Sequence, residues 1–223
     1  MRGLFVTATD TGVGKTEVAC AIVRGQRAAG LDVGAMKPAE SGRASERPGD
    51  AERLRAAAGD ADPLELVCPY RLGAPLAPAV AARLEGKTLS MGHLIEIATV
   101  LALRHSALVV EGAGGLLTPL TDSETYADLA AALGLPALVV ARAGLGTVNH
   151  TALTCEALRR RAVRIHGVVL NHPAPTTDPS EPFNAAEIER LTGASVLAVL
   201  PYSADIERRE RAFADELARK VHF

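Results

Sequence analysis

The sequence predicts an α/β fold, with a single doubly wound, mostly parallel sheet flanked by helices. Short, continuously apolar runs of the kind found in buried parallel strands alternate with amphipathic helical patterns along all 223 residues. The first such run leads directly into a glycine-rich turn and a helix. Because no repeat or low-complexity tract interrupts this alternation, we expect residues 1–223 to form one domain.

The sequence predicts a phosphate-binding loop between the first strand and the first helix. An apolar run at 4–6 is followed by the turn TDTGVG and then by Lys15 and Thr16. Gly12 and Gly14 let the backbone curl around phosphate oxygens, and the unpaired N–H groups of the helix start point at them. Lys15 can reach the β- and γ-phosphates, while the Thr16 hydroxyl can ligate Mg²⁺. The alternative is a strand-to-helix turn with a solvated lysine.

A second strand, 33–36, carries a lysine to the edge where open α/β sheets bind ligands. Pro38 cannot continue a hydrogen-bonded ladder, so Lys37 is expected at the carboxyl end of this strand. A polar segment over 43–49 is expected to be mobile. Asp50 opens a predicted helix, where it can serve either the site or the helix N-terminus.

A buried strand over 107–110 ends at Glu111 and a run of glycines. A carboxylate at such a strand end, downstream of a phosphate-binding loop, is the arrangement that holds Mg²⁺ directly or through water. A strand-end acid that caps the following turn is the alternative. Between the second strand and this one, residues 68–79 are expected to form an ordered connection, and Ser90 to cap a helix that ends near Leu103.

The second half of the chain continues the alternation. Strands are expected at 136–141, 165–170 and 195–200, and helices at 125–133, 147–161, 184–192 and 205–220. The helix after Gly146, capped by Thr147 or Asn149, offers a second anion site, although every capped helix does so. Asn171 follows a strand and can read an adenine edge or satisfy a turn; the residues alone favour the turn.

The candidate residues are all expected at one edge of the sheet. Right-handed crossovers bring the carboxyl ends of parallel strands to one rim of the sheet, which predicts a single active site there. The groups that follow strand ends are Lys15, Lys37, Glu111, Gly146 and Asn171.

Composition excludes several classes of function. A net charge of −2, 3% aromatic residues and no Trp give no electrostatic or stacking basis for nucleic-acid binding. Three widely spaced cysteines without a C-x-x-C pair predict neither a zinc ribbon nor a disulfide framework. The start shows no signal-peptide pattern and no apolar run reaches the ~18 residues of a membrane span, so we expect a cytoplasmic protein without a membrane partner.

Taken together, the motifs resemble those of the dethiobiotin synthetase family, whose members have a P-loop NTPase-like fold. The resemblance spans nearly the whole chain, with Ala8 where members commonly have Gly and with the weakest match over 173–223. It is carried by VTATDTGVGKT (6–16), KPAESG (37–42), GDAERL (49–54), VVEGAGGLLTPL (109–120), GLGTVNHTALT (144–154) and VVLN (168–171).

The resemblance implies a homodimer that converts 7,8-diaminopelargonate, CO₂ and ATP to dethiobiotin, ADP and phosphate. It also implies roles for individual residues. Lys15 and Lys37 would stabilise the carbamate and the transferring phosphoryl group, and Thr11 and Ser41 would contact that region. The remaining implied roles are Mg²⁺ binding by Thr16, Asp50 and Glu111; ATP binding by Gly12, Val13, Gly14, Lys15, Thr16, Asn171 and Pro201; and binding of the substrate's far carboxylate across the dimer interface by Gly146, Thr147 and Asn149, with Ser41 also at the substrate.

The same motifs leave three other classes of protein as alternatives. A partition or positioning ATPase would have a second lysine in the phosphate-binding loop, where this chain has Asp10. An amidotransferase-type ligase would need a glutaminase domain, for which 223 residues leave no room. A nucleotide-binding module without chemistry would not need Lys37 and Glu111 at the same rim.

Overall fold

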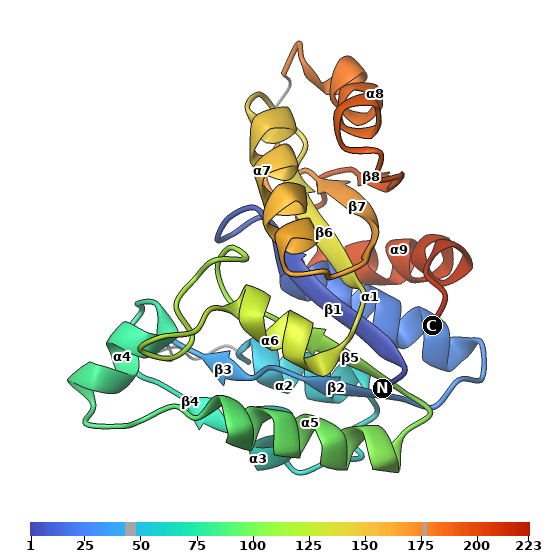
Figure 1. The fold of residues 1–223 in the computed structure, drawn as a ribbon. Coiled ribbons are helices and arrows are strands. Elements are labelled where there is room, and N and C mark those ends of the chain that lie inside the picture. The colour runs from blue at the N-terminus through green and yellow to red at the C-terminus, as the bar shows by residue number, and fades with distance from the viewer. Residues whose placement is uncertain (43–47, 176–177) are drawn as a thin grey trace.

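Six parallel strands form one sheet in the order β2–β5–β1–β6–β7–β8 (Figure 1). The computed structural model describes residues 1–42, 48–175 and 178–223. The strands are β1 (Gly3–Ala8), β2 (Val33–Met36), β5 (Ala107–Glu111), β6 (Ala137–Arg142), β7 (Ile165–Asn171) and β8 (Val196–Leu200). The prediction of a mostly parallel, doubly wound sheet is therefore confirmed, and the chain reverses its direction of winding at β1.

The central strands are apolar on both faces because helices cover both faces. Every residue of β1 and β5 is buried, and Phe5 lies in register with Val110 on one side and Ala137 on the other. This complete burial explains why these strands read as continuous apolar runs rather than as alternating ones.

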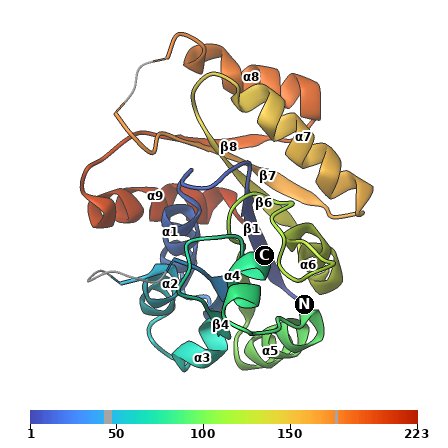
Figure 2. The same cartoon turned by 90° about the vertical axis from the view of Figure 1, so that its left-hand side faces the viewer.

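The helices form two layers, one on each face of the sheet (Figures 1 and 2). One layer contains α1 (Lys15–Ala28), α2 (Asp50–Ala57) and α9 (Ile206–Lys220), whose apolar side chains form one core cluster with that face of the sheet. The other face packs against α4 (Pro78–Leu84), α5 (Met91–Arg104), α6 (Tyr126–Leu133), α7 (Thr147–Arg160) and α8 (Glu181–Thr192).

Most predicted helix boundaries agree with the structure. Ser90 is the N-cap of α5 and its hydroxyl accepts a hydrogen bond from the His93 N–H. Thr125 and Asp128 form a capping box at the start of α6, and Gly134 ends that helix in the left-handed region.

The predicted cap of α7 is wrong. The N-cap position belongs to Gly146, at φ +90°, and no side chain caps the helix. The hydroxyl of buried Thr147 lies 3.5 Å from that of Thr151, and Asn149 is exposed. A left-handed backbone at the N-cap favours Gly.

The segment between β2 and β5 contains more regular structure than predicted. Besides α4, it includes the short helix α3 (Leu64–Val67) and a two-stranded parallel pair of β3 (Ala39–Glu40) and β4 (Tyr70–Arg71). Residues 68–79 are thus an ordered connection, as expected, with one strand and a helix start inside it. The predicted mobile segment 43–49 falls largely outside the described residues.

The last helix returns to the first. α9 packs along α1, and Gln26 on α1 donates hydrogen bonds to the carbonyls of Ala218 and Val221 at 3.1 and 2.6 Å. Figure 1 shows the end of α9 on the same side of the sheet as α1. Among the described residues, none of the helices combines the length and the apolar character that a membrane crossing requires.

Candidate active site

A cavity of about 340 Å³ opens at the carboxyl ends of β1, β2 and β5. Most of the residues predicted for phosphate and metal binding line it, which confirms that the strand ends bring them together. The lining residues are Thr11, Gly12, Gly14, Lys15, Thr16, Glu17, Lys37, Glu40, Ser41, Asp50, Arg53, Ala113, Gly114, Pro173 and Arg209.

The loop between β1 and α1 has the backbone that a phosphate cradle needs. Gly12 and Gly14 adopt φ of +71° and +96°, a region that L side chains rarely occupy. A Cβ on Gly14 would lie 2.1 Å from the Asn171 Nδ2 atom, so only Gly fits. Lys15 Nζ donates to the Asp10 carbonyl at 3.2 Å, and burial lowers the pKa of Lys15 to about 8.

Lys37 lines the cavity. Its Nζ atom is 2.5 Å from Glu111 Oε1 and 3.1 Å from Asp50 Oδ2, and it also donates to the Gly112 carbonyl at 3.1 Å. Lys37 and Glu111 are almost completely buried. Burial alone would lower the pKa of Lys37, but the two carboxylates outweigh it and raise that pKa. The buried ammonium is therefore held charged.

Thr16, Asp50 and Glu111 place hard oxygen atoms around one point. The Thr16 hydroxyl donates to Glu111 Oε1 at 2.8 Å, and Lys37 bridges the two carboxylates. Glu111 Oε2 is buried without a hydrogen-bond partner among the described residues. A hydroxyl and two carboxylates are the donors that Mg²⁺ prefers, and the free Oε2 atom leaves room for one more interaction. These residues fit a bound Mg²⁺.

Asn171 faces the phosphate-binding loop rather than a turn of its own strand. Its Nδ2 atom donates to the carbonyl of buried Val13 at 2.8 Å, while its Oδ1 atom is buried and has no partner in the described part of the chain. Pro201, by contrast, is exposed after β8 and does not line the cavity. The amide thus presents one free acceptor beside the loop.

The structure does not bring Gly146, Thr147 and Asn149 to this cavity. The start of α7 lies beyond β6, and α7 borders a different hollow of about 380 Å³ between the helix and the 115–118 loop. His150 and Leu153 line that second hollow. Leu117, Leu145 and Leu153 leave 52%, 79% and 57% of their surface exposed, so this side of the molecule is apolar.

Four charged lining residues escaped prediction from the sequence. Arg209 on α9 is buried and forms an ion pair with Glu17 on α1 at 2.8 Å, and Arg53 on α2 pairs with buried Glu210 at 2.5 Å. The Asp50 N–H donates to Glu40 Oε1 at 2.6 Å. The sequence of α9 is typical of a charged, solvated helix, so it did not indicate that Arg209 lines the cavity. Glu40 and Arg53 lie within the sequence motifs at 37–42 and 49–54, but only the tertiary fold shows that their side chains line the cavity.

The fold and this constellation define a P-loop nucleoside-triphosphate-dependent enzyme. The family model described as "AAA domain" matches residues 2–210. Among solved structures, a ParA family ATPase from Chlorobium tepidum TLS aligns with a TM-score of 0.57 at 12% identity, over 97% of this chain and 92% of that one. The MinD cell division protein of Aquifex aeolicus aligns with a TM-score of 0.58 at 12% identity, over 97% and 89%. At such identities the likeness concerns the fold alone.

Closer relatives specify the family. The chain is 66% identical over 223 residues to the ATP-dependent dethiobiotin synthetase BioD of Anaeromyxobacter dehalogenans (strain 2CP-C), with 100% of both chains covered. It is 39% identical over 206 residues to the enzyme of the same name from Bacillus licheniformis, covering 92% of this chain and 88% of the relative. The chain therefore belongs to the ATP-dependent dethiobiotin synthetase family, a family of C–N bond-forming ligases.

Proposed function

We propose that this chain, acting as a single ATP-dependent ligase domain, converts 7,8-diaminopelargonate, CO₂ and MgATP to dethiobiotin, ADP and phosphate. The observation that carries the proposal is the placement of Lys37. A buried, charged ammonium faces two carboxylates beside a phosphate-binding loop, at a distance of 2.5 Å from Glu111. A second lysine, Lys15, opens onto the same cavity.

The reaction needs no nucleophile from the protein. One substrate amine takes up CO₂ as a carbamate, whose oxygen attacks the γ-phosphorus and displaces ADP. The second amine then attacks the carbonyl carbon of the resulting carbamic-phosphoric anhydride, expels phosphate and closes the cyclic urea. All three cysteines of the chain are buried, and burial raises the pKa of each thiol, to about 12 for Cys68. Catalysis is thus positioning and neutralisation of charge.

The two lysines supply the positive charge. Lys15 would bind the β- and γ-phosphates, and Lys37 would stabilise the carbamate and the phosphoryl group that moves to it. Thr11 and Ser41, at the rim of the same cavity, would contact the carbamate and phosphate region, with Ser41 also at the substrate. In the structure, Lys37 pairs with Asp50 and Glu111.

Thr16, Asp50 and Glu111 would hold Mg²⁺. Bound there, the ion would neutralise phosphate charge, which is the chemistry that this cation supplies in phosphoryl transfer. Lys37 pairs with both carboxylates, and Mg²⁺ bound to them would compete with it, which would direct its ammonium to the substrate.

The nucleotide would follow the phosphate-binding loop. The backbone of Gly12, Val13 and Gly14 would surround the phosphates, and the free Oδ1 acceptor of Asn171 would contact the adenine amino group. Pro201 would contribute only through its backbone, near the adenine.

The substrate's far carboxylate would bind at the start of α7 of a second copy. Gly146, Thr147 and Asn149 lie outside the catalytic cavity of their own chain. They would therefore contribute to the catalytic cavity of the second copy. The apolar hollow beside α7 and the exposed Leu117, Leu145 and Leu153 support an interface there. We place this homodimer in the cytoplasm, without nucleic-acid or membrane partners.

The test is phosphate release from MgATP with diaminopelargonate and bicarbonate, each omitted in turn, with mass detection of dethiobiotin. We expect release that requires both substrates and that matches the urea product in amount. Release independent of diaminopelargonate would overturn the proposal and favour a switch ATPase. Asp10 stands against that alternative, because its carboxylate binds Arg142 at 3.0 Å where a switch ATPase would carry a lysine.

A further inference from the structure

The reaction as proposed gives no role to Arg209, a residue of α9 that lines the catalytic cavity. Its side chain is only 4% exposed, and a guanidinium buried to this degree usually has all its N–H groups paired. Arg209 pairs through Nη2 with Glu17 Oε2 at 2.8 Å, but its Nε atom is buried without a hydrogen-bond partner within residues 1–42, 48–175 and 178–223. The guanidinium thus retains one N–H donor for a ligand.

Glu17 holds that guanidinium against the phosphate-binding loop. Glu17 follows Thr16 in the first turn of α1 and itself lines the catalytic cavity. A Cβ built on Gly14 would lie 2.5 Å from Glu17 Oε2 and 2.1 Å from Asn171 Nδ2, so both side chains border the loop on the same side of Gly14. Arg209 therefore lies on the side of the loop that carries Asn171.

The α-phosphate and ribose of a bound nucleotide would pass this position. With the β- and γ-phosphates on the loop and the adenine at Asn171, these two groups are the part of ATP that lies between. The carboxylate of Glu17 alone would repel an α-phosphate there. Arg209 neutralises that carboxylate and adds a donor, so the pair turns an unfavourable position into a favourable one.

Neighbouring contacts fix the backbone of Arg209. Glu210, the next residue of α9, is buried and forms ion pairs at 2.5 Å with Arg24 of α1 and with Arg53 of α2. These pairs hold firmly, because removal of its partners would leave a buried charge uncompensated. The first turn of α9 is thereby joined to both of the helices that border the catalytic cavity.

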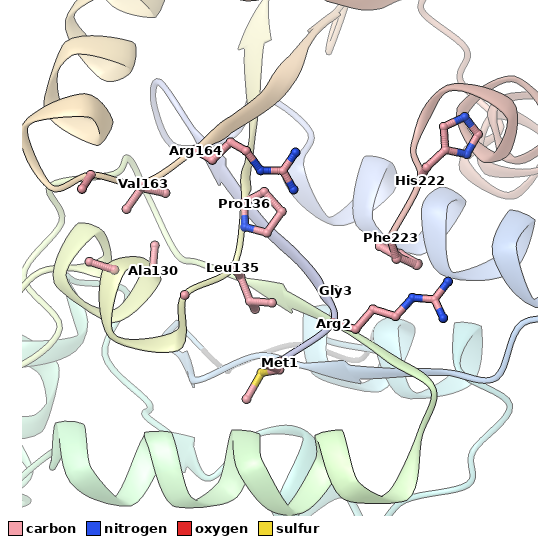
Figure 3. Close-up of a pocket in the computed structure, with 13 residues that line it drawn as sticks. Met1, Arg2, Gly3, Ala130, Leu135, Pro136, Val163, Arg164, His222 and Phe223 are labelled. Carbon is pink, nitrogen blue, oxygen red and sulfur yellow. The ribbon is translucent and has the colours of Figure 1, made fainter.

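The other end of α9 is fixed at the opposite edge of the sheet. Val221 is fully buried, and its carbonyl accepts a hydrogen bond from Gln26 of α1 at 2.6 Å. His222 and Phe223 then line a separate cavity of about 310 Å³ that Met1 also borders, beside the start of β1 (Figure 3). Because α9 is held at both ends, the fold itself places its first turn at the catalytic cavity.

We propose that Arg209 is a nucleotide-binding residue, whose Nε–H donates to the α-phosphate of ATP while Nη2 stays paired with Glu17. The inference rests on the position of the nucleotide in the proposed function. A guanidinium suits this double task because its N–H donors point in fixed directions within one plane, whereas the ammonium of a lysine is a point charge. The ion pair with Glu17 orients that plane.

The first test is binding of MgADP to the full chain by isothermal titration calorimetry. Arg209→Gln should weaken binding at least about tenfold, a loss typical of a charged hydrogen bond, and should weaken binding of 2′-deoxy-ADP by the same factor. Arg219→Gln, at an exposed arginine of the same helix, should leave both affinities unchanged. An Arg209→Gln variant that loses affinity for MgADP but not for 2′-deoxy-ADP would assign the contact to the ribose and overturn the proposal. An unchanged affinity for MgADP, or no binding to the unsubstituted chain, would overturn it too.

A double variant separates the contact from a secondary effect of charge. Arg209→Gln leaves Glu17 without its partner, and the freed carboxylate would itself repel the nucleotide. Glu17→Gln combined with Arg209→Gln removes both charges, so no unpaired carboxylate threatens the fold. This double variant should bind MgADP at least about fivefold more weakly than Glu17→Gln alone. Equal affinities would assign the loss to the carboxylate and contradict the contact.

Kinetics supply a second readout. The α-phosphate does not change during the reaction, so its contact should be equally strong in the ground and transition states. Arg209→Gln should therefore raise KM for MgATP at least about tenfold and leave kcat within about twofold. A fall in kcat at unchanged KM would contradict the assignment. The MgADP titration needs no diaminopelargonate, so the expected losses of affinity in a chain that forms no dethiobiotin would support Arg209 and overturn only the proposed reaction.

Discussion

Lys37 brings a positive charge into a place that almost no water reaches. Its ammonium is stable there only because Glu111 and Asp50 surround it, and their carboxylates raise its pKa against the effect of burial. The arrangement neutralises the charge of the two carboxylates. It also places a cation next to the phosphate-binding loop, where phosphoryl transfer would occur.

Lys37→Ala should abolish formation of dethiobiotin, with a loss of at least about 10²-fold, because a preorganised charge at the reacting group is removed. The fold should persist, since buried Glu111 can take up a proton once its cation is gone. Mass detection of the product and circular dichroism check the two statements. Lys87→Ala, at an exposed lysine, serves as control and should retain full activity. Near-normal turnover of Lys37→Ala would remove this residue from the mechanism.

Ala162→Gly should stabilise the protein by about 1 kcal/mol, contrary to the usual effect of adding Gly. Ala162 follows α7 at φ +56°, in a turn where Val163 N–H donates to the Leu158 carbonyl at 3.0 Å. Gly adopts this conformation without steric cost. Urea unfolding gives the change in free energy. Ala58→Gly, at a helix end with φ −80°, should give no gain; equal effects of the two variants would contradict the argument.

At the scale of helices and strands, the first and last helices approach unusually closely. A Cβ on Gly25 of α1 would lie 2.2 Å from the Ala214 carbonyl oxygen of α9. The backbones of the two helices thus approach each other directly at this point. The contact explains why a residue with poor helix propensity stands in the middle of α1.

Gly25→Ala should therefore destabilise the protein by about 1–3 kcal/mol, although Ala favours helices, because the added methyl group overpacks the α1–α9 contact. Chemical denaturation measures the change. Gly92→Ala, on α5, is the matched control: its Cβ would have only Ser90 Oγ nearby, at 3.7 Å, so it should be neutral or stabilising. Stabilisation by Gly25→Ala would show that the two helices separate easily.

His105, the residue after α5, connects this helix to two other segments of the chain. Its Nδ1 atom is 2.9 Å from Asp32 Oδ1, and its Nε2 atom is 2.6 Å from Asp62 Oδ2. Burial alone would lower the pKa of His105, but the two carboxylates outweigh it and raise that pKa. A raised pKa in the folded state means that the stabilising contribution is complete below the unfolded value of about 6.5 and disappears as pH rises through the folded value.

His105→Asn should therefore reduce the decline of the unfolding free energy between pH 6.5 and the higher folded pKa. Urea titrations at several pH values, compared with the unsubstituted chain, isolate this contribution. His93→Gln, at a half-exposed histidine, should leave the decline unchanged. An identical pH dependence in all three proteins would exclude His105 as its source.

Sequence patterns predict the long elements well and the short ones poorly. The six strands of the large sheet are apolar runs that can be recognised from the local sequence. Their predicted positions agree with the structure to within one or two residues. β3 and β4 have two residues each, and their pairing depends on tertiary contacts that no local pattern contains. The strand-end rule likewise located Lys37 and Glu111, whereas Arg209 lines the cavity only because α9 folds back across α1.

At the scale of the whole molecule, one side remains apolar. The hollow beside α7 and the exposed leucines around it form a surface that a second copy can cover. In the proposed dimer this surface would bring the start of α7 to the partner's catalytic cavity. Catalysis and association would then depend on the same face.

Leu153→Asp should convert the proposed dimer to a monomer and reduce activity, because a carboxylate would be buried among apolar side chains. Light scattering after size-exclusion chromatography determines the mass in solution. Leu103→Asp introduces the same charge on α5, where 84% of the leucine surface is exposed, and should leave the mass unchanged. A monomeric unsubstituted chain with full activity would contradict the dimer.

Met1 and Phe223 border the same cavity, at the edge of the sheet farthest from the phosphate-binding loop. A chain whose two ends adjoin can be joined there by a short linker and opened elsewhere. The exposed turn at 85–88, between α4 and α5, offers a place for new ends. Such a circular permutant would keep the order of strands in space while changing their order of synthesis, so that β5 and β6 would leave the ribosome before the phosphate-binding loop.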